Sequence, residues 1–448
     1  MTIDKHITIS DLSRLLKNKK ISSKEVIDSF IDQSEIYEPT LNVWVTMDPD
    51  LAIKTALKCD EQIAAGRYRG PLHGIPLGVK DIYFTKDMPT TCCSPIYQNY
   101  QSEYDAEVVQ LLREAGSIIM GKTVTTQFAC GDPSPTKNPW DLNKTPGGSS
   151  SGSAVGVAAG YFPASIGSQT AGSVLRPAAF NGLVGFKPTY GLVSRYGQYP
   201  VSPSLDTVGW FTRSVHDSAI LLQCLAGYDH RDNGSIYSEI PKYEVESEKN
   251  DLPRIGFVNQ YYSQKSDYKN FRRLESLASK FEEAGATLDE IYINISFEHF
   301  LAQHAVIMAT EAAQTHKDNF PNRAGDYSPK VKDLIEKGLR ISDTQYKNAI
   351  TSQITLSAVV EDIFDSYDVL ICPTAISSAP STETTGDPSF QAVWTMSGAP
   401  TINLPYSIDD AGLPIGVQII GRKFSEHKLL SVAHWMENII GFDKKPNE

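Results

Sequence analysis

The chain has 448 residues, of which 41% are hydrophobic and 21% charged, and its formal net charge at pH 7 is −12. This composition is ordinary for a soluble globular protein, so a disordered chain is not the default interpretation. The excess of acidic residues disfavours direct binding to nucleic acid or to an anionic membrane surface, because both carry negative charge.

The first 66 residues are predicted to form helices. Ser22 and Glu25 match a capping box at a helix start, and apolar residues follow Glu25 at helical spacing. A further helix is predicted over residues 51–65. Residues 1–10 contain no apolar stretch of the kind found in secretory signals, and the chain has no run of about 18 apolar residues. We therefore expect neither a signal peptide nor a membrane-spanning helix.

From residue 75 onward, predicted strands alternate with helices, which is typical of an α/β layered sheet. Short apolar runs predict strands over 75–79, 117–121, 164–168, 183–186, 255–258, 369–372, 402–404 and 416–420. Helical spacing predicts helices over 105–115, 150–160, 271–284 and 427–439. Helices dominate 297–364, which we interpret as an insertion or cap. The polar stretch 229–253 is a candidate linker, but the alternation resumes at once and favours a loop within one domain covering 1–448.

The six cysteines form no CxxC pair. In a chain of this length their spacing excludes a disulfide scaffold and a zinc ribbon. Reduced thiols in a cytoplasm are the simplest interpretation, so we expect a cytoplasmic protein. We expect no metal or other cofactor, and the chain has no HExxH motif.

Two segments rich in glycine and serine stand out, TPGGSSSGSA at 145–154 and GSQTAGSVLRP at 167–177. Each runs from a turn into a predicted helix of small or apolar residues. A helix start offers unpaired backbone N–H groups and positive dipole character, so such a segment can hold an oxyanion.

Two common interpretations of such segments fit poorly. A phosphate-binding loop requires GxxxxGK[ST], or GxGxxG after a strand, and neither segment has these patterns. Residues 148–152 match the GxSxG motif of esterases, with Ser150 as the nucleophile. That motif needs a strand before the serine, whereas residues 138–146 contain two prolines and two asparagines. The missing strand disfavours the esterase, which stays as an alternative.

Lys80 offers a different base for a serine nucleophile. A serine hydroxyl is a poor nucleophile until a base takes its proton, and burial lowers the pKa of a lysine so that it can act as that base. Lys80 follows the predicted strand 75–79, with Asp81 beside it. On position alone, a lysine that extends its amine to water is the better interpretation.

Three ordered motifs change that interpretation, because they resemble the core of the amidase-signature family. The family pattern reads approximately GxPxxVKD, then PGGSSxGS, then GGSxRxPA. This chain has GIPLGVKD at 74–81, PGGSSSGS at 146–153 and AGSVLRPA at 171–178. Ser149 and Ser173 are 24 residues apart, which matches the family spacing. The resemblance covers residues 9–434.

The resemblance implies an α/β/α layered domain with a mixed central β-sheet flanked by helices. It implies that Ser173 attacks the carbonyl, while Ser149, preceded by a cis peptide bond from Gly148, relays the proton to Lys80. Ser150 would support this network by hydrogen bonding. The acyl-enzyme on Ser173 would then be hydrolysed by water. The implied oxyanion hole consists of the N–H groups of Thr170, Ala171, Gly172 and Ser173.

The chain departs from the family in the second serine segment. Many members have DTGGSIR, where this chain has QTAGSVLR at 169–176. Gln169 replaces an aspartate, and Ala171 replaces a glycine, so the backbone there must avoid positive φ or accept strain. Arg176 follows the serine by three residues instead of two, and it could pair with a substrate carboxylate or with a buried acid of the chain. These departures resemble free-standing amidases more than the A subunit of tRNA-dependent amidotransferases.

The resemblance implies a serine-dependent amidohydrolase that cleaves the C–N bond of a small non-peptide amide, with carbamates, urea-type bonds and esters as further substrates. One alternative is the ammonia-releasing A subunit of a tRNA-dependent amidotransferase complex, inactive without its partners. Another is an inactive interaction protein, which the intact set of Lys80, Ser149 and Ser173 disfavours. We expect a small-molecule amide as the partner, with no nucleic acid and no membrane, and a homodimer stays open.

Specificity in such a fold resides in loops and in the cap. Five side chains are candidates to line an acyl or leaving-group pocket, although each also suits a core position: Phe128, Cys130, Tyr196, Met308 and Trp394. If they line the pocket, an aromatic or apolar acyl group is favoured over a charged one.

Overall fold

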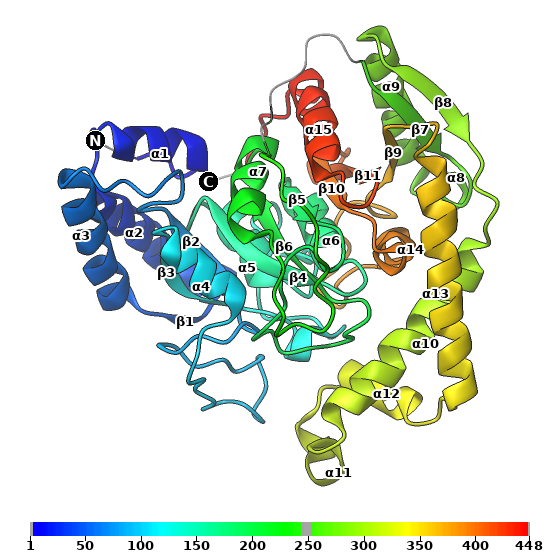
Figure 1. Ribbon diagram of the computed structural model, residues 1–448, viewed down its shortest axis with the longest axis horizontal. Helices are drawn as coiled ribbons and strands as arrows, with labels where there is room; N and C mark the ends of the chain where they lie inside the picture. The colour runs from blue at the N-terminus through cyan, green and yellow to red at the C-terminus, as the bar shows by residue number, and fades with distance from the viewer. Residues whose placement is uncertain (1–2, 244, 246–251, 447–448) are drawn as a thin grey trace.

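The computed structural model describes residues 3–243, 245 and 252–446. Its eleven strands form one sheet in the order β1-β3-β2-β4-β6-β5-β10-β11-β9-β7-β8 (Figure 1). Neighbours of β2 and of β7 run parallel, and the other pairs run antiparallel, so the sheet is mixed as predicted. The strands are β1 (Trp44–Met47), β2 (Pro76–Lys80), β3 (Ile118–Thr123), β4 (Ala164–Gln169), β5 (Val184–Lys187), β6 (Thr207–Thr212), β7 (Arg254–Val258), β8 (Thr287–Ile291), β9 (Val369–Pro373), β10 (Thr401–Ile408) and β11 (Pro414–Gly421).

Helices cover both faces of this sheet. An ideal Cβ on Gly416 of β11 would lie 3.0 Å from Ala179, and one on Gly421 of the same strand would lie 2.9 Å from Leu429. Because side chains alternate along a strand, positions five apart face opposite sides. The helices that hold Ala179 and Leu429 therefore lie on opposite faces, which confirms the predicted layers. The helices are α1 (Ile9–Lys17), α2 (Ser23–Leu41), α3 (Pro49–Ala64), α4 (Glu107–Glu114), α5 (Ser151–Ala158), α6 (Leu175–Asn181), α7 (Val215–Leu225), α8 (Tyr262–Lys265), α9 (Tyr268–Glu283), α10 (Phe297–His316), α11 (Phe320–Arg323), α12 (Pro329–Gly338), α13 (Asp343–Ile363), α14 (Ser389–Ser397) and α15 (Glu426–Ile440).

Each predicted range contains an element of the predicted type, with ends shifted by a few residues. The capping box of Ser22 and Glu25 is present at the start of α2. The prediction of helices alone for the first 66 residues is wrong at β1, a four-residue edge strand that pairs with β3. Five more strands and α-helices were not predicted: β6, α7, α8, β8 and α14.

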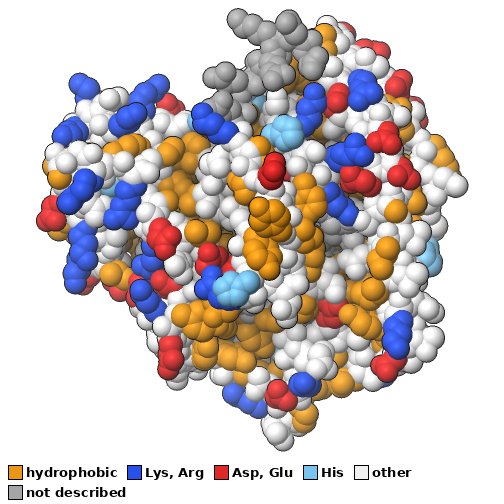
Figure 2. Space-filling model, viewed as in Figure 1, with side chains coloured by type: hydrophobic (Ala, Val, Ile, Leu, Met, Phe, Trp, Pro, Cys, Tyr) orange, Lys and Arg blue, Asp and Glu red, His pale blue; other side chains and the backbone are white. Residues whose placement is uncertain are grey.

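The helical segment 297–364 forms α10, α11, α12 and α13. In Figure 1 these helices lie along one side of the molecule, opposite α1, α2 and α3. Helix α10 packs against α12, α13 and α14, so it connects the outer helices to the body of the protein. In the described part of the chain no helix is both long and apolar enough to cross a membrane. Figure 2 shows Lys and Arg side chains interspersed with Asp and Glu on the viewed face.

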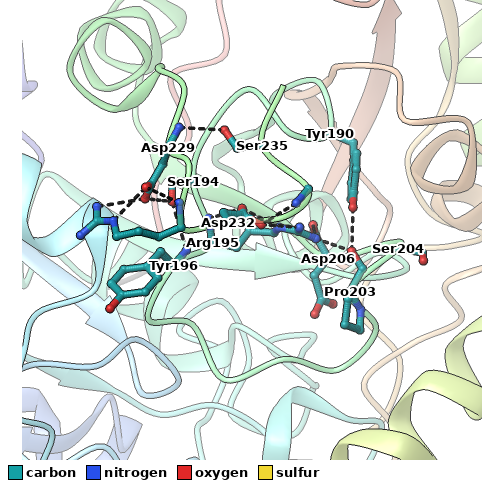
Figure 3. A network of polar contacts seen from close by, with 12 residues as sticks. Tyr190, Ser194, Arg195, Tyr196, Pro203, Ser204, Asp206, Asp229, Asp232 and Ser235 are labelled. Carbon is teal, nitrogen blue, oxygen red and sulfur yellow. Dashed lines mark hydrogen bonds and ion pairs between the residues drawn. The ribbon is translucent and has the colours of Figure 1, made fainter. Parts of the chain in front are cut away.

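The candidate linker 229–253 lies partly outside the described residues, which omit 244 and 246–251. Its first part is fixed to the loop after β5 (Figure 3). The guanidinium of Arg195 pairs with Asp232, with Nη2 and Oδ1 2.7 Å apart, and the Ser194 hydroxyl donates to Asp229 over 2.7 Å. Residues 229–235 therefore pack against the body of the protein instead of connecting freely.

Candidate active site

Lys80 lies at the end of β2, between the parallel strands β3 and β4, and its side chain is fully buried. The interpretation of a lysine that reaches water is therefore wrong. Its Nζ lies 2.7 Å from Ser149 Oγ and 2.9 Å from Ser168 Oγ. Because β4 is the neighbour of β2, the sheet register brings Ser168 beside the amine. The amine and two hydroxyls thus form one hydrogen-bonded cluster in the interior.

Burial changes the chemistry of this amine. Removal from water disfavours the ammonium form and lowers the pKa of Lys80 to about 7, while the carboxylate of Asp206 acts in the opposite direction. A large fraction of the amine is therefore neutral near pH 7 and can take a proton from Ser149. Asp206 is itself buried, which raises its pKa to about 6, so it is mostly ionised at neutral pH.

The turn that contains Ser149 is held by its backbone. The peptide bond between Gly148 and Ser149 is cis, and the Ser149 carbonyl accepts hydrogen bonds from the N–H groups of Thr126 and Ser151. Arg176 Nη2 donates to the Gly148 carbonyl over 2.8 Å. These contacts fix the position of the Ser149 hydroxyl relative to Lys80.

Arg176 is fully buried, and its hydrogen bonds go to backbone carbonyls. Besides Gly148, its Nε donates to the Thr385 carbonyl over 2.7 Å. Burial lowers the pKa of Arg176 to about 10, and the charge of Asp387 partly offsets this. The guanidinium forms no ion pair with an acid of the described residues, and its Nη1 has no hydrogen-bond partner there. The predicted pairing with a buried acid is therefore not what holds this side chain.

The loop between β4 and α6 contains Ser173 and the predicted oxyanion hole. Gln169 Oε1 accepts from the N–H groups of Val174 and Leu175, 2.9 and 3.0 Å away, so the amide that replaces the family's aspartate ties the loop to the start of α6. The N–H groups of Ala171, Gly172 and Ser173 donate to no described residue. They are therefore available to a developing oxyanion.

Two further properties of this loop suit a reaction site. Ala171 does not adopt a positive φ, so the replacement of glycine introduces no strain there. Ser173 is 9% exposed, so it lies inside the protein while keeping some contact with solvent. Its predicted role as the nucleophile stays a prediction, as do the roles of Thr170, Ala171 and Gly172.

Ser150 lies directly after Ser149 and is fully buried. Its hydroxyl donates to the Ser168 carbonyl over 3.3 Å, and no described histidine contacts it. Residues 138–150 contain no strand, as expected from their prolines and asparagines. The surroundings of Ser150 thus lack two features that a GxSxG esterase needs.

The five pocket candidates lie in different places. Phe128 and Cys130 lie in the loop after β3, where Phe128 packs against Tyr199 and Tyr327. Trp394 is buried in the core, with its Nε1 bonded to Tyr262 Oη over 2.7 Å. Tyr196 stacks on Tyr104 and lies under Arg231, and Met308 is half-buried on α10. Cys130 Sγ donates to the Phe128 carbonyl over 3.4 Å, and among the described residues no hydrogen bond or ring contact joins this pair to Tyr196, Met308 or Trp394.

Several residues around the cluster were not predicted. Ser168 lies within the second serine segment, at the end of the strand predicted over 164–168. That position was the one sign in the sequence that it could lie near Lys80. Asp206 Oδ1 accepts from Thr170 Oγ1 over 2.6 Å, and His304 Nε2 donates to the Thr170 carbonyl over 2.9 Å. Thr395 Oγ1 donates to the Ala171 carbonyl over 2.7 Å. No local pattern marks Asp206, His304 or Thr395, because they come from distant parts of the chain.

Among the described residues no group of three or more His, Cys, Asp or Glu could hold a metal ion.

Comparison with known proteins assigns the family. The family model described as Amidase matches residues 25–430. The A subunit of glutamyl-tRNA(Gln) amidotransferase from Picosynechococcus is 34% identical, over 98% of this chain and 99% of the relative. The provisionally named amidase AmiD of Mycobacterium tuberculosis is 33% identical, over 98% of this chain and 95% of the relative. The solved peptide amidase of Stenotrophomonas maltophilia superposes with a TM-score of 0.89 at 27% identity, covering 98% of both chains. The chain therefore belongs to the amidase-signature family and is an amidohydrolase that acts on carbon–nitrogen bonds.

Proposed function

We propose that this protein hydrolyses a small non-peptide amide through an acyl-enzyme on Ser173, with Ser149 and Lys80 moving the proton. The observation that carries the proposal is the hydrogen bond of 2.7 Å between Lys80 Nζ and Ser149 Oγ, inside a site where burial lowers the pKa of Lys80 to about 7. Lys187 is buried too, with its pKa lowered to about 7, but it donates to two backbone carbonyls, whereas the hydrogen bonds of the Lys80 amine among the described residues go to serine hydroxyls.

In the proposed first step, Ser173 Oγ attacks the amide carbonyl carbon. Its proton passes to Ser149, whose own proton passes to Lys80, and the N–H groups of Thr170, Ala171, Gly172 and Ser173 stabilise the oxyanion. The C–N bond then breaks, and the proton returns through Ser149 to the leaving nitrogen. In the second step water attacks the ester on Ser173, and the same relay returns the proton to Ser173 as the acid leaves.

The proposed substrate range includes carbamates, urea-type bonds and esters, since each presents a carbonyl to the same nucleophile. The similar solved structure is named a peptide amidase, which supports attack on an amide bond. The six described cysteines are all free, which supports a reducing cytoplasm as the place of the reaction.

A second candidate is the ammonia-releasing A subunit of a tRNA-dependent amidotransferase. The 34% identity to such a subunit, over almost the full length of both chains, favours it. In that case the purified chain alone would release little ammonia. The two candidates share the nucleophile and differ in their need for partners.

Ammonia release by the purified chain separates these candidates. We expect release from a panel of neutral linear amides, and loss of at least about 10³-fold in Ser173→Ala, because a nucleophile is removed. Wild-type protein that is inert on the whole panel would favour the partner-dependent subunit.

The same panel with added carboxylate-bearing amides tests whether Arg176 binds a substrate carboxylate. A preference for acidic amides that survives Arg176→Ala would exclude this role.

A further inference from the structure

Helix α10 reaches the loop of the proposed oxyanion hole through one histidine. His304 lies on α10 and is fully enclosed, with 4% of its surface exposed. Its Nε2 lies 2.9 Å from the Thr170 carbonyl oxygen. Since a carbonyl oxygen can only accept, Nε2 carries the proton and donates it. A side chain more than 130 positions away in sequence thus contacts the backbone of the loop.

The contact between His304 and the Thr170 carbonyl determines the direction of the Ala171 N–H. The Thr170 carbonyl and the Ala171 N–H belong to one peptide unit, which is trans, because the only cis bond among the described residues joins Gly148 to Ser149. In a planar trans unit the C=O and N–H point in opposite directions. By holding the carbonyl, His304 fixes where the Ala171 N–H points. Thr395 Oγ1 holds the Ala171 carbonyl in the same way, which fixes the Gly172 N–H.

Helix α10 is itself anchored close to the same loop. Glu311 follows His304 by seven residues, two helical turns on the same face. Its carboxylate accepts from Ser202 Oγ over 2.6 Å and from the Ser204 N–H over 2.9 Å. The loop of Ser202 leads to Asp206, whose carboxylate holds the Thr170 hydroxyl. Helix α10 therefore cannot shift without moving both contacts to Thr170.

We propose that His304 is a positioning residue for C–N bond cleavage: it holds the Thr170 carbonyl so that the Ala171 N–H points at the oxyanion formed on Ser173. The inference rests on the proposed function, because it needs Ser173 as the nucleophile. It extends that function by assigning a part of the catalytic geometry to α10, a helix outside the three signature motifs.

A fluorophosphonate probe tests this role with the full chain. The reaction forms a bond between Ser173 Oγ and phosphorus and breaks the P–F bond, fluoride leaves, and the serine proton passes through Ser149 to Lys80. The phosphonyl oxygen takes the place of the oxyanion. We would compare wild type, His304→Phe, His304→Gln and His299→Ala, and measure the maximal labelling rate and the half-saturating probe concentration at Ser173. His304→Phe keeps a ring without a donor, and His304→Gln keeps a donor. His299 is an exposed control on the same helix.

We expect His304→Phe to lower the maximal rate about 10- to 100-fold, since loss of a whole oxyanion donor costs about 10²–10³-fold. The half-saturating concentration should stay within about threefold, and His304→Gln and His299→Ala should label within about threefold of wild type. The rate constant is fitted to the time course of labelling, whereas the fraction of protein that is folded changes the final amount labelled. Partial unfolding of a variant therefore does not change the fitted rate constant. A wild-type rate in His304→Phe, or equal slowing in His304→Phe and His304→Gln, would overturn the inference while Ser173 remains labelled. Wild-type protein labelled at a residue other than Ser173 would overturn the proposed function together with it.

Discussion

The amine of Lys80 is enclosed by the strands beside β2, and two acids near it, Asp206 and Asp81, have different partners. Asp206 raises the pKa of Lys80 through its charge and also holds the Thr170 hydroxyl. Asp81, the residue next to Lys80, pairs instead with Lys122, with Oδ1 and Nζ 3.1 Å apart. Among these, Asp206 links the base and the oxyanion loop, so it is the residue whose change should report on both.

The pH dependence of labelling at Ser173 tests this link. The rate should rise with pH through an inflection near about 7, because only the neutral amine of Lys80 can take the proton. Asp206→Asn removes the charge that favours the ammonium, so the inflection should move to lower pH. The plateau should fall roughly 10-fold, since Thr170 loses an anchor. Asp365→Asn, at an exposed site, is the control, and an inflection that stays in place or rises in Asp206→Asn would contradict this role.

The same buried amine should reduce stability. The pKa of Lys80 is lower in the folded chain than in the unfolded chain, so the unfolded chain binds more protons between about pH 7 and the ordinary lysine pKa. At high pH the amine is neutral in both states. As pH falls through that window, the unfolded chain takes up the proton first, so the free energy of unfolding decreases. Lys80→Met should be inactive and more stable at pH 7, because methionine removes the cost of burying the amine, with a smaller gain at pH 10. Urea denaturation at both pH values measures this, and a larger gain at pH 10 would show that burial of the charge is not the cause.

Sequence patterns located the residues that lie within continuous motifs, and the hydrogen bond between Lys80 and Ser149 agrees with that placement. They did not locate Asp206, His304 or Thr395. Each of these acts on Thr170 or Ala171 through one contact made across 36 to 224 positions of sequence. Such contacts depend on how helices and loops pack, and no spacing along the chain encodes them.

At the scale of elements, helix α5 shows why small residues recur near the site. All eight residues of α5 are buried, and an ideal Cβ on Gly152 would lie 2.4 Å from the Val43 carbonyl oxygen and 2.6 Å from the Val124 N. Both neighbours are backbone atoms, which cannot move aside easily. The absence of a side chain at Gly152 therefore lets α5 pack closely against the backbone next to β1 and β3.

Gly152→Ala should accordingly destabilise the protein by about 1–3 kcal/mol, the usual cost of overpacking. Gly227→Ala is the matched control, because nothing lies within 4 Å of an ideal Cβ there, and it should change stability by less than about 0.5 kcal/mol. Chemical denaturation of both variants gives the comparison. Equal stability of Gly152→Ala and wild type would mean that α5 can shift without cost.

Two of the missed strands, β6 and β1, have a common reason at this scale. The strand β6 is fully buried and has the sequence TVGWFT, in which a central glycine and polar threonines at both ends interrupt the apolar run that predicts a strand. The edge strand β1 has four half-buried residues between two helices, so helical spacing on both sides dominates its pattern. Such strands form because of the strands that they pair with, and their own sequence contains no clear apolar run. Sequence patterns alone therefore do not predict them.

Over the whole molecule, the proposed site is assembled from both halves of the chain. Strands β2 and β4 supply Lys80 and Ser168 from the first half, and helices α10 and α14 supply His304 and Thr395 from the second. The single mixed sheet joins these halves, since β6 and β5 connect β4 to β10 (Figure 1). Catalytic geometry therefore depends on the fold of nearly the entire chain, and we expect no shorter fragment to retain activity.

The most direct test of the account is to treat the purified chain with a fluorophosphonate and to locate the adduct by peptide mass spectrometry, in wild type and in Lys80→Ala. We predict one adduct on Ser173 that falls by at least about 10³-fold in rate in Lys80→Ala, because no other base contacts Ser149 among the described residues. An adduct on Ser150, or labelling of Ser173 at an unchanged rate in Lys80→Ala, would contradict the proposed roles of Ser173, Ser149 and Lys80.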